Sequence, residues 1–209
     1  MLTVLLTPTS RSWLEAAIAD LACATPRLLI DHAHCEKKAA AMALRHIERH
    51  AGWPRLAARM SRLAREELVH FERVLEELRA RGMRFRGQPG SGYGSGLLAA
   101  VRPPSAPPAG GVGSWLGDRT VDEMLVCALI EARSHERFVL LAEALGGEGL
   151  GSLYADLRDA EARHGEIYLE LASEASGGGD AVVRLAELVA VEARVVARPG
   201  MPLRIHAGG

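Results

Sequence analysis

An all-α fold is predicted by two features of the sequence, its composition and the spacing of its apolar residues. Aromatic residues make up only 4% of the 209 residues, whereas Ala, Leu, Arg and Glu, which favour helices, are abundant. In four long stretches, apolar residues recur at steps of three and four, the period of a buried helix face. The length suits one domain, residues 1–209, with a substantial core.

The expected helices are separated by glycines and prolines, and several begin at residues that cap helices well. Ser10 or Ser12 can cap the first helix, Asp118 or Thr120 the third long one, and Asp180 the last. The helices are expected at about residues 10–24, 26–50, 54–81, 96–101, 118–145, 150–175 and 180–197. Long helices that are joined by a short loop must lie antiparallel.

Two segments fall outside this helical pattern. Residues 82–117 are rich in Gly, Pro and Ser, and so long a connection inside a compact domain tends to be functional or mobile. A bundle of two helix pairs also needs one long crossover, so we expect this segment to link the pairs. Residues 198–209 contain two prolines and three glycines and are expected to form a loose tail.

One short motif, Glu-x-x-His, occurs twice on the apolar faces of the long helices, each time 30 or 31 residues after a single acid. Residues three apart share one face of a helix, so each copy can aim a carboxylate and an imidazole at one point. The two half-sites are Glu36 with Glu67 and His70, and Glu131 with Glu161 and His164.

These four carboxylates and two imidazoles on four helices are the ligand set of a two-metal site in a ferritin-like bundle. Buried carboxylates repel one another in a low-dielectric core unless they are protonated or neutralised by cations. Mixed carboxylate and imidazole ligands suit iron or manganese. The sequence leaves open which carboxylates bridge the metals. We therefore expect a ferritin-like four-helix bundle with one long crossover, extra terminal helices and two metal ions.

Polar residues near the motifs are expected to have other roles. His135 lies one turn beyond Glu131 and is expected to be a hydrogen-bonded core histidine or a support for a ligand. His32 and His34 are expected to point away from the site, for packing or at the surface. Glu66 is expected on a solvated helix face with arginines as neighbours.

Charge and cysteine content exclude several classes of protein. The chain has 25 Lys and Arg against 26 Asp and Glu, and the small basic excess of its first half is far weaker than a nucleic-acid-binding tail. Three cysteines without CxxC spacing indicate neither a disulfide framework nor a zinc site. The sequence shows no signal peptide and no run that could span a membrane. A soluble, cytoplasmic protein with no membrane partner is expected.

The residues around the motifs resemble those of one protein family. The similar runs are Leu29–Ala40, Glu66–Phe71, Ile130–Phe138 and Glu161–His164, within a likeness that covers about residues 10–195. They resemble the tRNA hydroxylase family known as MiaE, whose members hydroxylate the isopentenyl group of 2-methylthio-N6-isopentenyladenosine beside the anticodon. Members use two nonhaem irons, dioxygen and external reducing equivalents. The resemblance implies a diiron-dependent tRNA-modifying monooxygenase whose metals are held by the six motif residues.

The resemblance also implies partners. The substrate would be tRNA, and an external donor of the reductase or ferredoxin type would supply electrons. A tRNA anticodon loop is a polyanion with splayed bases, which proteins bind through arginines and by stacking. The long crossover and its ends supply such side chains, and the predicted tRNA contacts are Arg84, Arg86, Arg102 and Tyr93.

The same ligand set also occurs in ferritin-like proteins with other functions, because fold and ligands do not settle the reaction. The alternative to the hydroxylase is an iron-oxidising or peroxide-handling protein. Iron-storage proteins assemble into cages, which the long crossover and the extra terminal helices do not suit. A monomer or dimer is therefore expected, with iron favoured over manganese.

Overall fold

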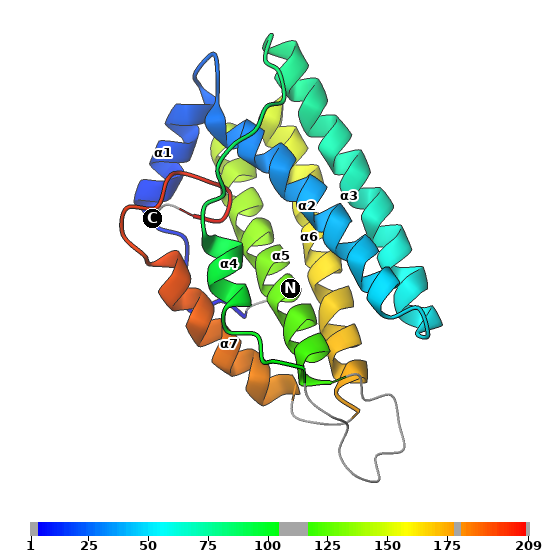
Figure 1. The fold of residues 1–209 in the computed structure, drawn as a ribbon. Helices are drawn as coiled ribbons and strands as arrows, with labels where there is room; N and C mark the ends of the chain where they lie inside the picture. The colour runs from blue at the N-terminus through cyan, green and yellow to red at the C-terminus, as the bar shows by residue number, and fades with distance from the viewer. Residues whose placement is uncertain (1–3, 105–116, 178–180, 208–209) are drawn as a thin grey trace.

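The computed structural model describes residues 4–104, 117–177 and 181–207, and these ranges are largely helical (Figure 1). The helices are α1 (Arg11–Leu21), α2 (Arg27–Arg49), α3 (Pro54–Ala80), α4 (Tyr93–Leu98), α5 (Asp118–Leu145), α6 (Leu150–Ala175) and α7 (Ala181–Val196). Within the described ranges there is no strand, only an isolated bridge between Arg204 and Ala207. None of the described helices is long and apolar enough to cross a membrane.

Four long helices form the bundle in two antiparallel pairs (Figure 1). α2 packs along α3, α5 packs along α6, and α3 contacts α6 where the pairs meet. The crossover leaves the end of α3, passes α2, forms α4 in front of α5 and leads to the start of α5 at the other end of the bundle (Figure 1). α1 and α7 both contact α5. The predicted four-helix bundle with one long crossover and extra terminal helices is confirmed.

Local sequence sets the start of two helices in different ways. Ser10 caps α1, because its hydroxyl accepts a hydrogen bond from the Trp13 amide (3.1 Å). At α5, however, Gly117 occupies the N-cap position. The prediction that Asp118 or Thr120 caps this helix is therefore wrong. Asp118 lies in the first turn instead, where its negative charge suits the helix dipole.

The short helix of the crossover lies earlier than expected, at residues 93–98 rather than 96–101. It begins directly after Gly92, whose φ of +83° is a left-handed conformation that favours glycine. The expected cap of the last helix, Asp180, lies outside the described residues.

Two hydrophobic clusters fill the bundle, one on each side of a polar layer. One cluster draws on the first halves of α3 and α5 and the second halves of α2 and α6. The other draws on the opposite halves of the same helices, together with α1. The single acids and the Glu-x-x-His motifs lie between the clusters on all four helices. Because apolar layers exclude water on both sides, the polar layer lies in a low-dielectric environment.

Residues 204–207 do not belong to the loose tail that was expected for residues 198–209. Residues 204–207 are buried, and Ile205 is fully buried. The amide of Ile205 donates to Asp31 Oδ2 on α2 (2.7 Å). We call residues 204–207 the C-terminal strap.

Two further buried side chains donate hydrogen bonds to the strap. The indole of Trp13 donates to the Arg204 carbonyl (3.0 Å), and the guanidinium of Arg137 donates to the carbonyls of Arg204 and Ile205 (3.1 and 2.7 Å). Prolines and glycines nearby indicate an irregular chain path, but they carry no information about these partners on α1 and α5.

Candidate metal centre

The six motif residues meet in the polar layer, and none is more than 8% exposed. Glu36 comes from α2, Glu67 and His70 from α3, Glu131 from α5, and Glu161 and His164 from α6. Helical spacing aims both members of each motif at one side, and the packing of the four helices brings their polar turns to one level.

The six side chains form two ligand groups that share two carboxylates. One group is Glu36, Glu67, His70 and Glu161, and the other is Glu67, Glu131, Glu161 and His164. Within each group, one ligand atom from each residue lies within 4.8 Å of all the others. Each group therefore offers three carboxylates and one imidazole. Glu67 and Glu161 belong to both groups, so the geometry favours these two motif acids as bridges between two metal ions.

Several atoms of the cluster are buried without a hydrogen bond, which tests whether metals fit. Among the described residues, both carboxylate oxygens of Glu67, Oε1 of Glu161 and Nδ1 of His70 and His164 have no hydrogen-bond partner. His164 Nδ1 nevertheless lies 2.7 Å from Glu67 Oε1, and His70 Nδ1 lies 3.6 Å from Glu67 Oε2 and 4.0 Å from Glu161 Oε1. Because buried polar atoms are rarely left unpaired, converging oxygens and nitrogens of this kind fit metal ions well.

The pKa values of the buried groups in the cluster also favour binding of cations. Burial, together with the charges of Glu36 and Glu67, raises the pKa of Glu161 to about 8. Burial beside Glu161 raises the pKa of Glu131 well above its ordinary range. Burial opposes a charged His164, but the surrounding carboxylates outweigh it and raise the pKa of that imidazole to about 9. Burial also raises the pKa of Glu67, whereas His32 and His70 hold that of Glu36 low. Three of the four carboxylates thus disfavour carrying their charges together, and two divalent cations would offset the repulsion.

Two residues that contact the predicted ligands have roles that differ from those expected from the sequence. His32 donates from Nε2 to Glu36 Oε1 (2.6 Å), so the expectation that His32 points away from the site is wrong. Glu66 is half-exposed, but it also accepts a hydrogen bond from Nε2 of His164 (2.9 Å). This bond turns Nδ1 of that imidazole toward the cluster. The first contact could have been found from the i, i+4 spacing, whereas the second joins α3 to α6 and has no signal in the sequence.

The other two neighbouring histidines lie outside the ligand cluster, and His135 is a half-buried, hydrogen-bonded residue, not a core one. His34 donates to the carbonyl of Arg86 (2.9 Å), and His135 donates to the carbonyl of Arg158 (2.8 Å). Neither belongs to the two ligand groups.

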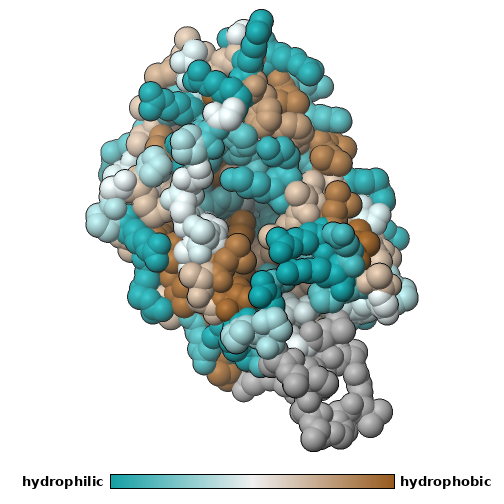
Figure 2. Space-filling model, in the orientation of Figure 1, coloured by the Kyte–Doolittle hydropathy of each residue, from teal (hydrophilic) through white to brown (hydrophobic). Residues whose placement is uncertain are grey.

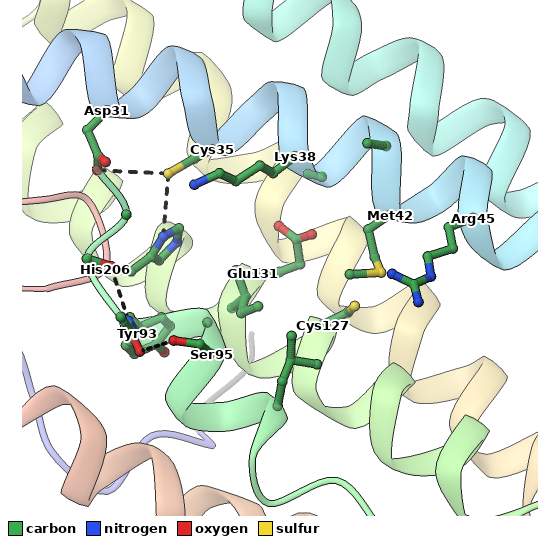
Figure 3. Close-up of a pocket in the computed structure, with 18 of the residues that line it drawn as sticks. Asp31, Cys35, Lys38, Met42, Arg45, Tyr93, Ser95, Cys127, Glu131 and His206 are labelled. Carbon is green, nitrogen blue, oxygen red and sulfur yellow. Dashed lines mark hydrogen bonds between the residues drawn. The ribbon is translucent and has the colours of Figure 1, made fainter. Parts of the chain in front are cut away.

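A pocket of about 510 Å³ opens beside the ligands, between α2, α4 and α5 (Figure 3). Its buried floor includes Tyr93, Cys127, Glu131, Tyr168 and His206, and its exposed mouth includes Lys38, Arg45, Ser95 and Leu98. The Glu131 carboxylate points from α5 into this space (Figure 3). Figure 2 shows this face hollowed near its centre, with hydrophilic side chains on the α2 side and hydrophobic ones over α4. The pocket is large enough for an organic substrate.

The C-terminal strap supplies one wall of the pocket through His206. The imidazole of His206 lies 2.8 Å from the hydroxyl oxygen of Ser134 and stacks on Tyr93, with ring centroids 5.3 Å apart. Tyr93 donates to Glu192 (2.9 Å), which forms a buried ion pair with Arg133 (2.8 Å). This network joins α4, α5, α7 and the strap, so the shape of the pocket depends on the C-terminal strap.

The four predicted tRNA contacts do not form one cluster. Tyr93 lies in the pocket floor, and Arg102 lines a neighbouring cavity and is paired with Asp122 (2.6 Å). Arg84 and Arg86 are exposed on the extended first part of the crossover, and neither lines the pocket. Their role in binding tRNA stays a prediction.

Fold and site together define a ferritin-like helical bundle with a buried glutamate and histidine centre. A solved structure agrees with this class: the chain is similar to "Protein 43 with aldehyde deformylating oxygenase activity from Synechococcus", with a TM-score of 0.85 and 38% sequence identity. The match covers 100% of this chain and 98% of that one.

The chain belongs to the MiaE family. The family model described as tRNA-(MS2IO6A)-hydroxylase (MiaE) matches residues 1–207. A relative from Pseudomonas putida is 42% identical over 202 residues, 96% of this chain and 90% of the relative. A relative from Salmonella typhimurium is 37% identical over 158 residues, 75% of this chain and 53% of the relative. Both relatives are named tRNA 2-(methylsulfanyl)-N(6)-isopentenyladenosine(37) hydroxylase. The family resemblance seen around the motifs is confirmed.

Proposed function

We propose that this chain is a diiron-dependent tRNA-modifying monooxygenase that hydroxylates the isopentenyl group of 2-methylthio-N6-isopentenyladenosine beside the anticodon. The observation that carries this proposal is the pair of ligand groups that share Glu67 and Glu161, together with the pocket whose floor includes the ligand Glu131. The names of the two curated relatives support the choice of substrate.

Iron is the metal that the proposal favours. Oxygen and nitrogen ligands of this kind suit iron and, less favoured here, manganese. When bound, two irons supply the activation of dioxygen, the co-substrate, that insertion of an oxygen atom into an unactivated C–H bond requires. The residues that would hold them are Glu36, Glu67, His70, Glu131, Glu161 and His164.

The chain's own residues bind and orient the substrate. The buried side chains of Cys127 and Tyr168 suit an apolar isopentenyl group, and they lie in the same pocket floor as Glu131. Lys38 and Arg45 at the mouth suit the ribose and phosphate part of the nucleotide. With the prenyl group in the floor, the reacting carbon is held next to the ligand cluster and away from bulk water.

The reaction needs partners beyond the chain. Hydroxylation consumes one dioxygen, two electrons and two protons and forms the alcohol and one water, so an external electron donor of the reductase or ferredoxin type is required. We place the protein in the cytoplasm with its tRNA substrate, as a monomer or dimer. Arg84 and Arg86, which are exposed on the crossover, are proposed as additional tRNA contacts.

A single turnover tests the proposed function. Reduced, iron-loaded protein is mixed with dioxygen and with bulk tRNA that carries the isopentenyl modification. The tRNA is then digested to nucleosides, whose masses are measured by mass spectrometry. We expect a gain of one oxygen on the prenylated adenosine. The gain should disappear in Glu131→Ala and persist in Glu15→Ala, a matched control whose side chain is 64% exposed. No gain from wild-type protein that binds two irons and consumes dioxygen would reject the hydroxylase.

A second function is favoured by one observation, the aldehyde deformylating oxygenase activity of the similar solved structure. The apolar pocket floor would also accept the alkyl chain of an aldehyde beside the same ligands. The aldehyde reaction consumes one dioxygen, four electrons and four protons and forms alkane, formic acid and water. Supplying a long-chain aldehyde, dioxygen and an excess of a chemical reductant to the iron-loaded protein and assaying alkane and formate tests this candidate. Fast iron oxidation with neither set of products would favour the iron-oxidising or peroxide-handling alternative.

A further inference from the structure

A second cavity, of about 330 Å³, adjoins the substrate pocket and is lined by arginines. The two cavities share Met42, Arg45, Leu98, Cys127 and Ile130. The arginines of the second cavity come from α2, the crossover and the first turns of α5, and they are Arg45, Arg49, Arg102 and Arg119. We call this cavity the arginine cleft. Among its lining residues, Glu123 is the one acid.

The arginine cleft carries more positive charge than its acid offsets. Arg49 and Arg119 share the single carboxylate of Glu123 (2.7 and 2.9 Å), and Arg102 is held by two aspartates of α5 outside the lining. Arg45 is exposed, and no carboxylate in the described part of the chain forms an ion pair with it. A guanidinium has five N–H donors in a planar fork that matches phosphate, and one carboxylate engages few of them.

We propose that the arginine cleft binds the phosphates of the nucleotides that flank the modified adenosine. This inference rests on the proposed function, because it takes the prenylated base to lie in the substrate pocket. The ribose–phosphate chain then leaves through the mouth at Arg45, a residue of both cavities. The ligand is a single-stranded RNA backbone, since a base that enters an enclosed pocket must leave its stack. The cleft positions the RNA, and the pocket reads the modification.

A purely structural role for these arginines makes a different prediction. The pair between Arg49 and Glu123 joins α2 to α5, so removing it would lower stability whether or not RNA binds. The informative changes are therefore Arg45→Gln and Arg119→Gln, which leave Glu123 its partner Arg49. Arg11→Gln is the matched control, because its side chain is 91% exposed and pairs with an acid four residues away.

The experiment compares two ligands of metal-loaded protein, a prenylated anticodon stem-loop and the free prenylated nucleoside. Binding of the stem-loop is followed by fluorescence anisotropy over a range of salt concentrations. We expect each substitution to raise the Kd of the stem-loop by about tenfold, as for loss of a charged hydrogen bond. The slope of log K against log salt should fall by about 0.7 for each arginine. Turnover of the nucleoside, which lacks phosphate, should be unchanged in Arg119→Gln, because Arg119 lines the arginine cleft and does not line the substrate pocket.

Three outcomes would overturn the arginine cleft. The first is an unchanged Kd and salt slope in a double variant whose melting temperature is normal. The second is an equal loss of nucleoside turnover in Arg119→Gln, which would assign this arginine to the base pocket. The third is binding of inorganic phosphate that is lost in the variants while their Kd for the stem-loop is unchanged, which would indicate a site for free phosphate. Failure of the proposed function looks different: wild-type protein would bind the stem-loop through the cleft yet hydroxylate neither ligand.

Discussion

At the scale of single residues, the proposed metal ligands differ in how many metal ions each would reach. Glu161 belongs to both ligand groups, whereas Glu36 belongs to one. We expect Glu161→Ala to lose nearly all bound metal, and Glu36→Ala to keep about one ion per chain. Metal content by plasma mass spectrometry after loading with Mn(II) or anaerobic Fe(II) distinguishes the two variants. Equal losses would show that the shared carboxylates do not bridge.

Acid sensitivity also depends on a single buried side chain, His46 on α2. Burial lowers the pKa of His46 from its ordinary 6.5 to about 4. As pH falls through this window, the unfolded chain takes up a proton before the folded one does, so stability present above pH 6.5 is progressively lost. The loss at pH 5 is about 2 kcal/mol.

The comparison that tests this loss is wild type against His46→Gln in urea unfolding at pH 8 and pH 5. The glutamine variant lacks the titrating group, so the difference in unfolding free energy between the two proteins should shift by about 2 kcal/mol in favour of the variant at pH 5. A difference that is independent of pH would exclude His46 as the source.

At the scale of elements, α5 carries charged residues inside the protein because other elements surround it. Arg133 on α5 forms its buried ion pair with Glu192 on α7, and Asp122 is paired with Arg102 of the crossover and Arg184 of α7 (2.6 and 2.7 Å). A buried charge is stable only when it is paired and hydrogen-bonded. The crossover and α7 thus supply the partners of these buried charges on α5. The hydrogen bond between Tyr93 and Glu192 also holds α4 against α7, beside the pocket.

The C-terminal strap is the element whose contribution is easiest to measure. Ile205→Ala removes a fully buried side chain from the cluster around Trp13 and Leu28. We expect a loss of about 3 kcal/mol in the free energy of unfolding, measured by chemical denaturation. Val182→Ala, at a residue 78% exposed on α7, should cost less than about 0.5 kcal/mol. Equal, small effects of the two changes would mean that the tail is loose in solution.

At the scale of the whole molecule, we expect metal binding and the stability of the bundle to be coupled. The proposed ligands come from all four long helices, so metal would bind only when the two helix pairs are assembled. A metal concentration of about 100 times Kd adds about 2.7 kcal/mol per site. For a chain of this length, this corresponds to a rise in Tm of about 5–10 °C for each occupied site. Thermal melts with and without Mn(II) measure the rise, and a similar rise in Glu161→Ala would attribute it to other sites.

The sequence by itself determined the long helices and the six polar residues that meet in the candidate metal centre. Both depend on local spacing: the acids and the Glu-x-x-His motifs interrupt apolar stripes with the period of a helix, and that period decides which side chains face inward. A long Gly- and Pro-rich segment between two helix pairs likewise indicated the crossover.

Only the tertiary structure decided how distant residues meet. It showed that Glu67 and Glu161 are shared by both ligand groups, and that Glu66 reaches His164 on another helix. It also closed one side of the pocket with His206 of the strap and placed the arginine cleft beside it. These features depend on distances between residues far apart in the chain, and no local pattern of apolar and polar residues encodes such distances.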